Sequence, residues 1–333
     1  MKFLVTMGEC ETRDSFFTPR AIAELKKHGE VVFNDTGSFA LTKAQLMEMI
    51  GGVDVLFSGW GAPRVDADVL AKADRLKVHA HTGGTVAGVV SHEEYGRGIA
   101  VLSGNDLYAR SVAEGCLMYT LMGLRRAEAY VNAVRQGGWR PEQDRNTGLI
   151  GKKVGLVGYG AIAQYYAELL QGFDVELYVY SKYMPDEEAD RIGARRVPKE
   201  YIFEHCDVIS LHSALNEENR GMITASLLSS IKAGALFVNT ARAGLVDDDA
   251  LLKELQSGRF QTVLDVYPVE PLATDSPFRS LDNALLLPHI AGPTFDMREK
   301  VVLELLADVL KIQQGESPRS AIPYDYAVRM TTS

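Results

Sequence analysis

Residues 153–172, KVGLVGYGAIAQYYAELLQG, constrain the fold of this chain more than any other segment. A short apolar strand pattern, Val154 to Val157, runs into Gly158-Tyr159-Gly160, and a helical pattern follows at once. When a strand, a glycine turn and a helix follow one another in this way, backbone N–H groups of the turn and the helix N-terminus can bind a pyrophosphate. Ala163 takes the third position of the G-x-G-x-x-G fingerprint, a replacement that the fingerprint tolerates. The pattern therefore predicts a dinucleotide-binding turn, with contacts from Gly158, Tyr159, Gly160, Ala161 and Ile162.

The strand and helix patterns on either side of this turn predict an α/β protein with two Rossmann-like domains. Residues 1–104 alternate between apolar strands and amphipathic helices, and six more strand patterns follow between 153 and 290. Such alternation is typical of doubly wound parallel sheets with helices on both faces. A last helical pattern, Thr294 to Gly315, is expected to return to the first domain. We expect a substrate domain of residues 1–104 plus 294–333, and a dinucleotide-binding domain of residues 105–293.

A long apolar helix is predicted between these domains. Ser111 and Glu114 have the spacing of a capping box, and the helical pattern then runs to Gly137-Gly138. Its first half is too apolar for a surface helix, so it should cross between the domains or pack on a second subunit, and we expect a homodimer. Trp139 follows this helix, and two interpretations of it are equally favoured. Its side chain lies near the cleft of the neighbouring subunit, or it packs locally.

Composition limits the partners and the compartment. A formal net charge of −9 argues against nucleic acid or an anionic membrane as the main partner. The N-terminus turns polar too early for a signal peptide, no apolar run approaches a membrane span, and three widely spaced cysteines suggest free thiols in a reducing cytoplasm. His79 and His81 alternate along one predicted strand, and we interpret them as pocket or surface histidines, with no metal site.

Three polar residues follow strand patterns of the second domain. Arg242 comes after ALFVNT, Glu270 lies five residues after Asp265 in the QTVLDV strand, and His289 follows ALLLP. The carboxyl ends of parallel strands meet at one edge of a sheet, where such sheets bind ligands. An arginine there can bind a carboxylate, a histidine can transfer a proton to or from an alcohol oxygen, and a carboxylate can orient that histidine.

At this point the sequence resembles the D-isomer-specific 2-hydroxyacid dehydrogenase family. The matching segments cover roughly residues 50 to 315 and keep their order: RSVAEGCLMYTL, GKKVGLVGYGAIA, NTARAGLVDDDALLKELQSGRF, LDVYPVEPL and LLPHIAGPT. The resemblance implies two Rossmann-like domains with the active site in the cleft between them, and a dimer formed through the cofactor domains.

The resemblance also implies roles for single residues. Arg242 would bind a small 2-oxo acid, Glu270 would support His289, and His289 would donate the proton as hydride reaches C2. Gly83 and Gly84 match a loop whose backbone N–H groups hold the substrate carboxylate, and Asp265 matches a position that contacts the nicotinamide amide. The remaining implied cofactor contacts are His212, Ser213, Thr240, Ala241, Arg242, His289 and Gly292.

Some positions depart from the family pattern, and two other functions compete. The loop HTGGTVAG lacks the Asp-Asn pair common after its glycines, so no particular 2-oxo acid is predicted. Tyr108, Ala214 and Ala243 replace residues that are frequent in the family.

One alternative function is that of a dinucleotide-sensing protein of the corepressor type, without metabolic turnover. The other is a formate dehydrogenase, against which Glu270 argues.

The cofactor is expected to be NADP or NAD, with a slight preference for NADP. The residue after the VELYVY strand should meet the adenosine ribose, and NAD-specific relatives typically place Asp there. This chain has Ser181 followed by Lys182. Without a carboxylate, the repulsion of a 2′-phosphate is lost, and a hydroxyl and an ammonium group can contact it.

Overall fold

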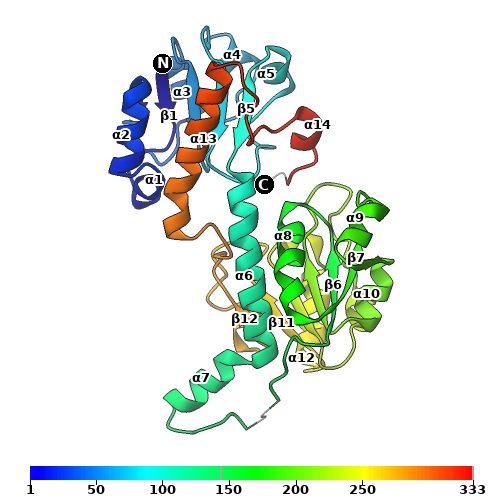
Figure 1. Cartoon of the computed structure of the whole chain (residues 1–333). Helices are drawn as coiled ribbons and strands as arrows, with labels where there is room; N and C mark the ends of the chain where they lie inside the picture. The colour runs from blue at the N-terminus through cyan, green and yellow to red at the C-terminus, as the bar shows by residue number, and fades with distance from the viewer. Residues whose placement is uncertain (143–144, 332–333) are drawn as a thin grey trace. The chain divides into compact units, whose positions relative to one another are not determined.

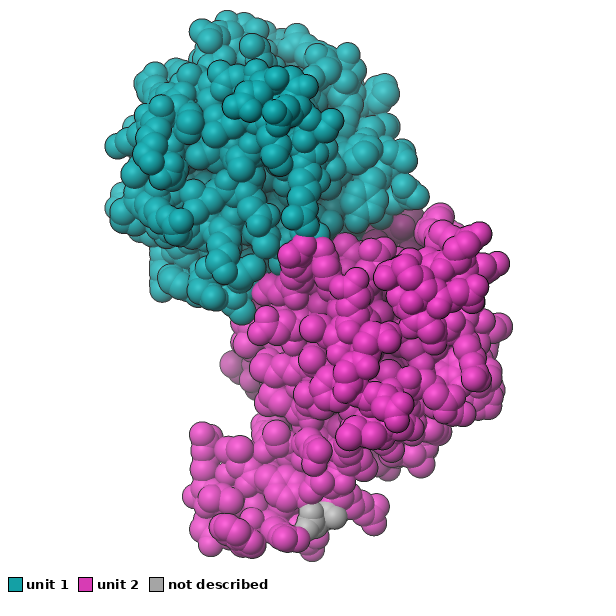
Figure 2. Space-filling model, viewed as in Figure 1, with its two compact units in different colours: residues 1–108, 293–333 teal, residues 109–292 magenta. Residues whose placement is uncertain are grey.

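The chain forms two compact units in the computed structural model, which describes residues 1–142 and 145–331 (Figures 1 and 2). Unit 1 comprises Met1–Tyr108 and Pro293–Ser333, and unit 2 comprises Ala109–Gly292. The chain thus leaves unit 1 at Tyr108, a few residues after the expected position, and returns to it at Pro293. Among the described residues, no helix is long and apolar enough to cross a membrane.

Unit 1 is built on a five-stranded, fully parallel sheet in the order β2-β1-β3-β4-β5. Its strands are β1 (Lys2–Val5), β2 (Glu30–Phe33), β3 (Val55–Ser58), β4 (Val78–His81) and β5 (Ala100–Ser103). Every residue of β3 and β4 is buried, as expected for central strands covered on both faces.

Helices cover both faces of this sheet (Figure 1). Its helices are α1 (Glu11–Phe16), α2 (Pro19–His28), α3 (Lys43–Met49), α4 (Ala67–Leu70), α5 (His92–Gly96), α13 (Arg298–Gln313) and α14 (Tyr324–Ala327). On one face, Val301 and Leu305 of α13 share a core cluster with Phe3. On the other face, Leu46 and Val69 share a cluster with Leu4.

Unit 2 is built on a seven-stranded parallel sheet in the order β12-β11-β10-β9-β6-β7-β8. Its strands are β6 (Lys153–Val157), β7 (Glu176–Tyr180), β8 (Ala194–Arg196), β9 (Val208–Leu211), β10 (Leu236–Asn239), β11 (Gln261–Leu264) and β12 (Ala284–Leu286). The strand order reverses at β6, so β6 and β9 flank the topological switch point at which sheets of this kind bind ligands.

Two core clusters lie on the two faces of this second sheet. One contains Tyr119 and Tyr166, and the other contains Ile202, Leu228 and Leu251. The helices of unit 2 are α7 (Ala127–Arg135), α8 (Ala161–Leu170), α9 (Asp186–Arg191), α10 (Lys199–His205), α11 (Ala225–Ser230) and α12 (Asp248–Gln256), together with most of α6 (Asn105–Arg125). Both units are therefore doubly wound α/β domains, as the sequence predicts.

The predicted long helix is in fact two helices, and its start was placed wrongly. The α6 helix begins at Asn105, whose N–H donates to the Ser103 hydroxyl at 3.2 Å, so Ser111 lies inside the helix instead of capping it. Arg126 then has a left-handed backbone (φ 51°), which ends α6 before α7 begins. Within unit 2, α6 packs closely on the sheet, because a Cβ at Gly123 would lie 2.7 Å from Leu236.

His79 and His81 do not lie on the surface. The two side chains are 0% and 3% exposed, inside unit 1, so the interpretation as surface histidines is wrong. Among the described residues, no group of three or more His, Cys, Asp or Glu side chains could hold a metal ion.

Candidate active site

The loops after β6 and β9 meet closely at the switch point of unit 2. Gly158 has a φ of 102°, and a Cβ there would lie 2.6 Å from the backbone nitrogen of Ser213 and 2.7 Å from the carbonyl carbon of His212. Only glycine fits both this backbone conformation and this approach. Gly160 is different, because nothing lies within 4 Å of its Cβ position, and it directly precedes α8. An open glycine at the N-terminus of a ten-residue helix fits a bound pyrophosphate.

The other residues of this turn are held by neighbours within unit 2. Ser213 donates from its hydroxyl to the Val157 carbonyl at 3.1 Å, and Nε2 of His212 lies 2.9 Å from the Ser210 hydroxyl. Burial of the His212 ring lowers its pKa, so the imidazole is neutral at physiological pH. The Tyr159 hydroxyl donates to Glu188 at 2.8 Å.

The end of β7 carries an ion pair that the sequence does not reveal. Lys182 donates to Glu218 from the loop after β9, and both side chains are at least half exposed. This hydrogen bond raises the pKa of Lys182. The Ser181 hydroxyl accepts from the N–H of Tyr183 at 3.2 Å. A carboxylate therefore lies beside the ammonium group expected to contact a 2′-phosphate.

Arg242 follows β10 in a turn that Asn239 holds from both sides. The Asn239 amide donates to the Arg242 carbonyl at 3.1 Å and accepts from the N–H of Ala241 at 3.0 Å. Beside this turn, the Thr240 hydroxyl contacts Sγ of Cys116 at 3.1 Å. Asn239 was missed by the sequence analysis, although an asparagine at the end of a strand is a common turn signal.

The Arg242 guanidinium has no carboxylate counter-ion within ion-pair distance among the residues that the structure describes. Nη1 donates to the Ala241 carbonyl at 2.7 Å. Burial lowers the pKa of Arg242, and the charge of Glu270 opposes that shift. A partly buried guanidinium without a counter-ion favours an anionic ligand, because its fork of donors matches a carboxylate.

Glu270 and His289 form a hydrogen-bonded pair, as the sequence predicts for an acid–base site. Oε2 of Glu270 lies 2.7 Å from Nδ1 of His289, and Oε1 accepts from the N–H of Tyr267 at 3.0 Å. His289 has a φ of 55°, a left-handed conformation in which histidine is enriched several-fold among non-glycine residues. Burial raises the pKa of Glu270, but the bonds from His289 and Tyr267 outweigh burial and leave it below the ordinary value.

Asp265 holds the backbone directly after His289. Its two carboxylate oxygens accept from the N–H groups of Ile290 and Ala291, each at 2.9 Å, and its side chain is 0% exposed. Burial, as the largest effect, raises the pKa of Asp265. Whatever contact this residue makes with a cofactor, it fixes the strained turn that presents His289.

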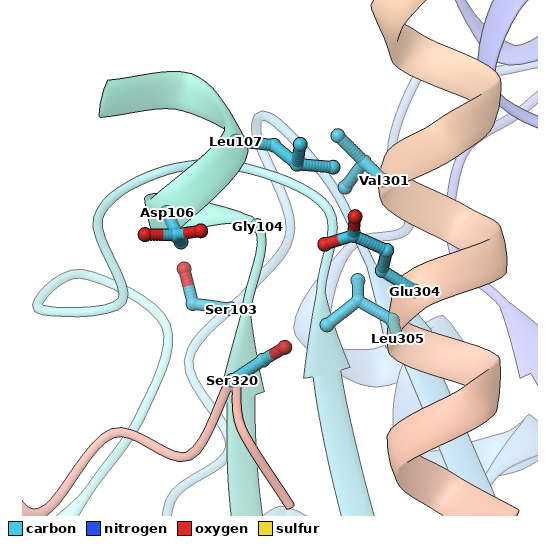
Figure 3. A pocket seen from close by; sticks show the side chains of 8 residues that line it. All are labelled: Ser103, Gly104, Asp106, Leu107, Val301, Glu304, Leu305 and Ser320. Carbon is cyan, nitrogen blue, oxygen red and sulfur yellow. The ribbon is translucent and has the colours of Figure 1, made fainter. Parts of the chain in front are cut away.

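A pocket of about 470 Å³ adjoins the Glu270–His289 pair within unit 2, a size typical of small-molecule sites. It is lined by Tyr267, Glu270, Pro271, Leu272, Arg279, Leu286, Leu287, Pro288 and His289. Unit 1 contains a much smaller cavity of about 10 Å³, between the start of α6 and α13 (Figure 3). That cavity has room for about one water molecule and for no substrate.

In unit 1, the loop of Gly83 and Gly84 leaves its N–H groups available. The Ser103 hydroxyl bonds both glycine carbonyls at 2.9 Å, which turns these carbonyls toward β5. Among the described residues, nothing accepts a hydrogen bond from the N–H of either glycine. Two free neighbouring amides fit an anionic group. Ser103 was not foreseen, because its contact spans about 20 residues of sequence.

The comparison of the sequence with protein families agrees with this geometry. Residues 117–291, just over half of the chain, match the family described as D-isomer specific 2-hydroxyacid dehydrogenase, NAD binding domain. The chain belongs to this family. It is therefore an oxidoreductase of the class that acts on a CH–OH group, with an NAD-binding domain in unit 2.

Individual relatives of this dehydrogenase differ in length. The hydroxypyruvate reductase of Thermotoga maritima is 32% identical over 275 residues, which cover 81% of this chain and 88% of the relative. The D-3-phosphoglycerate dehydrogenase of Methanocaldococcus jannaschii is 30% identical over 91% of this chain, but the match spans only 57% of that protein. Among solved structures, the TT0316 protein of Thermus thermophilus superposes with a TM-score of 0.78 at 28% identity, covering 97% of this chain and 100% of that chain.

Proposed function

We propose that this dehydrogenase reduces a small 2-oxo acid to the D-2-hydroxy acid, and catalyses the reverse reaction, with His289 as proton donor. The observation that carries the proposal is the 2.7 Å contact between His289 and Glu270, in the same unit as the uncompensated guanidinium of Arg242. When bound, the reduced nicotinamide supplies hydride to C2. The remaining work falls to side chains of the protein.

Each of these side chains has a role that follows from its chemistry. Arg242 binds the 2-oxo acid and polarises its carbonyl. Glu270 accepts from Nδ1 of His289, which leaves Nε2 as the position from which the proton passes to the alkoxide oxygen. Asp265 and Tyr267 hold this pair in place through backbone N–H groups. In unit 1, we propose that the N–H groups of Gly83 and Gly84 bind the substrate carboxylate.

We propose a small, unphosphorylated 2-oxo acid such as hydroxypyruvate or glyoxylate as the substrate. The similarity to the hydroxypyruvate reductase of T. maritima, at 32% identity, supports this choice. The corepressor interpretation is not favoured, since the relatives reported above with an activity in their names are a reductase and a dehydrogenase.

We propose NADP as the preferred cofactor, on the basis of Ser181 and Lys182. The Lys182–Glu218 ion pair weakens this preference without abolishing it, because exposed pairs of this kind are screened by solvent and contribute little. A 2′-phosphate carries more charge than one carboxylate, so it can take the lysine from Glu218.

We propose a homodimer, supported by apolar side chains exposed in unit 2. Val131 and Val134 of α7 are 45% and 53% exposed, and Trp139 is 79% exposed. Local packing of Trp139 is therefore wrong as an interpretation, and contact with a second copy is the hypothesis that remains. Val131 and Val134 are three residues apart and therefore lie on one side of α7, and exposed apolar side chains grouped in this way are typical of an interaction site.

A reducing cytoplasm is the compartment we propose. Cys10, Cys116 and Cys206 are all free thiols. Burial raises the pKa of Cys116 and of Cys206 to about 12 in each case, so both stay protonated and unreactive.

The experiment that tests the proposed function is a panel of 2-oxo acids with NADPH and NADH. Hydroxypyruvate, glyoxylate, pyruvate and phosphohydroxypyruvate are compared by kcat/KM, and the chirality of each product is determined. The expected result is turnover of hydroxypyruvate or glyoxylate to a D-2-hydroxy acid (or glycolate). Absence of turnover with every acid and both cofactors would contradict the proposal.

A further inference from the structure

Four buried side chains of unit 1 form a continuous hydrogen-bonded chain that the proposed chemistry does not use. Oε1 of Glu94 lies 2.8 Å from Nδ1 of His79, and Nε2 of His79 lies 2.7 Å from the Ser58 hydroxyl. The same hydroxyl lies 2.8 Å from Nδ1 of His81. None of the four side chains is more than 3% exposed. Burying polar groups is unfavourable unless they are hydrogen-bonded, and apolar side chains could fill the same space, so such a network points to a role beyond packing.

The sheet register brings these residues together. Ser58, the last residue of β3, pairs with His81, the last residue of β4, and His79 lies two residues earlier on the same face. Glu94 comes from the first turn of α5. The series of hydrogen bonds therefore runs from α5 to the carboxyl end of β4, just before the Gly83–Gly84 loop.

His81 is the last residue of this series of hydrogen bonds, and its ring lies next to Gly83. A Cβ at Gly83 would lie 2.4 Å from Nε2 of His81, so only glycine leaves room for the ring in this orientation. No described residue makes a hydrogen bond to Nε2 of His81, although Nδ1 is bonded. The free ring nitrogen thus lies against the loop whose two N–H groups are also free.

The charge of the Glu94–His79 pair determines which nitrogen of His81 carries the hydrogen. Oε2 of Glu94 is buried without a partner among the described residues, so a net negative charge on the pair would be strongly unfavourable. A hydrogen on Oε2 would be a buried donor without an acceptor, which is also unfavourable. Two neutral arrangements avoid this: Glu94 protonated at Oε1 beside neutral His79, or a carboxylate beside an imidazolium. In both, Nε2 of His79 donates to Ser58.

The directions of the remaining hydrogen bonds follow from this donation by His79. Because Ser58 accepts from His79, its own hydrogen is donated to Nδ1 of His81. Burial, together with the charge of His79, lowers the pKa of His81 to about 3, so this ring is neutral at physiological pH. A neutral imidazole that accepts at Nδ1 carries its hydrogen on Nε2.

We propose that His81 is a substrate-binding residue, which donates from Nε2 to the carboxylate of the 2-oxo acid held by the N–H groups of Gly83 and Gly84. Ser58, His79 and Glu94 are positioning residues that fix its tautomer. The inference rests on the proposed function, because it takes the Gly83–Gly84 loop to bind substrate. It adds a third donor to that loop, and one that is distinct from the proton donor His289.

Substitutions at position 81 separate substrate binding from folding. His81→Asn keeps an acceptor for Ser58 and removes Nε2, and we expect it to raise KM for the 2-oxo acid about 10-fold or more, the size of a lost hydrogen bond to a charged group. His81→Gln places an amide nitrogen near the position of Nε2 and should restore KM to within about 3-fold of wild type. His92→Asn, the same change at an exposed histidine, is the control. A lowered Tm with wild-type KM in both position-81 variants would overturn the proposal.

The role of the positioning residues is tested separately, at Ser58. Ser58→Ala leaves His81 in place but frees its tautomer, so KM should rise by about 2- to 5-fold, while the Kd for NADPH stays at the wild-type value. If the Kd for NADPH changes as much as KM, or if KM does not move, Ser58 does not act through His81.

A measurement independent of turnover distinguishes failure of this proposal from failure of the proposed function. Long-range ¹H–¹⁵N spectra of protein labelled at histidine report the tautomer of each ring, and His81→Asn identifies the signals. We expect the Nε2–H tautomer for His81, and tighter binding of oxamate by wild type than by His81→Asn in calorimetry with NADPH present. An Nδ1–H tautomer, or equal oxamate affinity, would overturn the proposal even if the enzyme is active. Inactivity towards every 2-oxo acid, with both of these results as expected, would reject only the proposed function.

Discussion

Nδ1 of His289 lies 2.7 Å from Oε2 of Glu270, although the two side chains are 44% and 38% exposed. An ion pair with this exposure contributes little to the free energy of folding, about 0.2–1 kcal/mol. The surrounding structure nevertheless fixes both partners: Tyr267 donates to Glu270, and Asp265 holds the backbone after His289. Such support, around a histidine with a left-handed backbone, fits the proposed proton transfer better than a role in stability.

The pH dependence of turnover should reveal this pair. The pKa of Glu270 is below its ordinary value of 4.5, so its carboxylate is present above that pH and is lost only as the pH falls through the lowered value. Glu270→Gln removes this carboxylate but keeps an acceptor for Nδ1 of His289, so we expect kcat/KM to fall about 10-fold or more near neutral pH. Any loss of turnover that wild type shows as the pH falls through the lowered pKa of Glu270 should be absent in the variant. The measurement is kcat/KM from about pH 4 to about pH 9. Wild-type kcat/KM in Glu270→Gln at every pH would mean that Glu270 does not support the proton donor.

Arg242 should act mainly on the substrate, although the family resemblance also implies that it contacts the cofactor. Arg242→Gln removes the uncompensated guanidinium, so we expect KM for the 2-oxo acid to rise about 10-fold or more and kcat to fall, with an unchanged Kd for NADPH. Arg242→Lys is the matched variant, since it keeps the charge and loses the two-pronged hydrogen bonding. The kcat/KM of Arg242→Lys should lie between those of wild type and Arg242→Gln. Wild-type KM and kcat in Arg242→Gln would show that the carboxylate is bound elsewhere.

The Lys182–Glu218 pair gives a paired test of cofactor choice. Glu218→Gln frees the ammonium group, so the ratio of kcat/KM for NADPH to that for NADH should rise about 3-fold or more. Lys182→Ala should lower the same ratio, and Ser181→Asp should shift the preference to NADH. If wild type prefers NADH and none of the three variants changes the ratio, these positions do not select the cofactor.

The exposed face of α7 should determine the oligomeric state. We expect wild type to be a dimer at micromolar concentration, and the double substitution Val131→Ser and Val134→Ser to weaken it. Trp139→Ala should lower kcat/KM with a smaller effect on association. Light scattering and sedimentation measure the masses. A wild-type monomer at these concentrations would contradict the homodimer.

Sequence patterns predicted the parts of the fold that rest on local signals. The glycine turn, the strands β6 and β9 to β12, and the strand-end position of His289 all depend on short, strongly patterned segments. The short helices α1 and α3 were missed because fewer than two turns of periodicity separate poorly from a loop. The break at Arg126 was missed because an arginine with a left-handed backbone leaves no sequence signal.

Contacts between distant segments were beyond sequence reasoning. Lys182 meets Glu218 across 36 residues, and Ser58 meets His79 across 21 residues. Each of these pairs depends on the order and register of the strands, which periodicity does not determine. Glu270 and His289 were paired in advance only because two strand ends and a family resemblance coincided.

The proposed role of His289 is to donate a proton during reduction of a 2-oxo acid. The most direct measurement is single-turnover reduction of hydroxypyruvate or glyoxylate by enzyme loaded with NADPH, in wild type and in His289→Ala. We predict that His289→Ala slows the chemical step by about 100-fold or more, while the Kd for NADPH stays within about 2-fold of wild type. A rate of the chemical step in His289→Ala close to that of wild type would contradict the account.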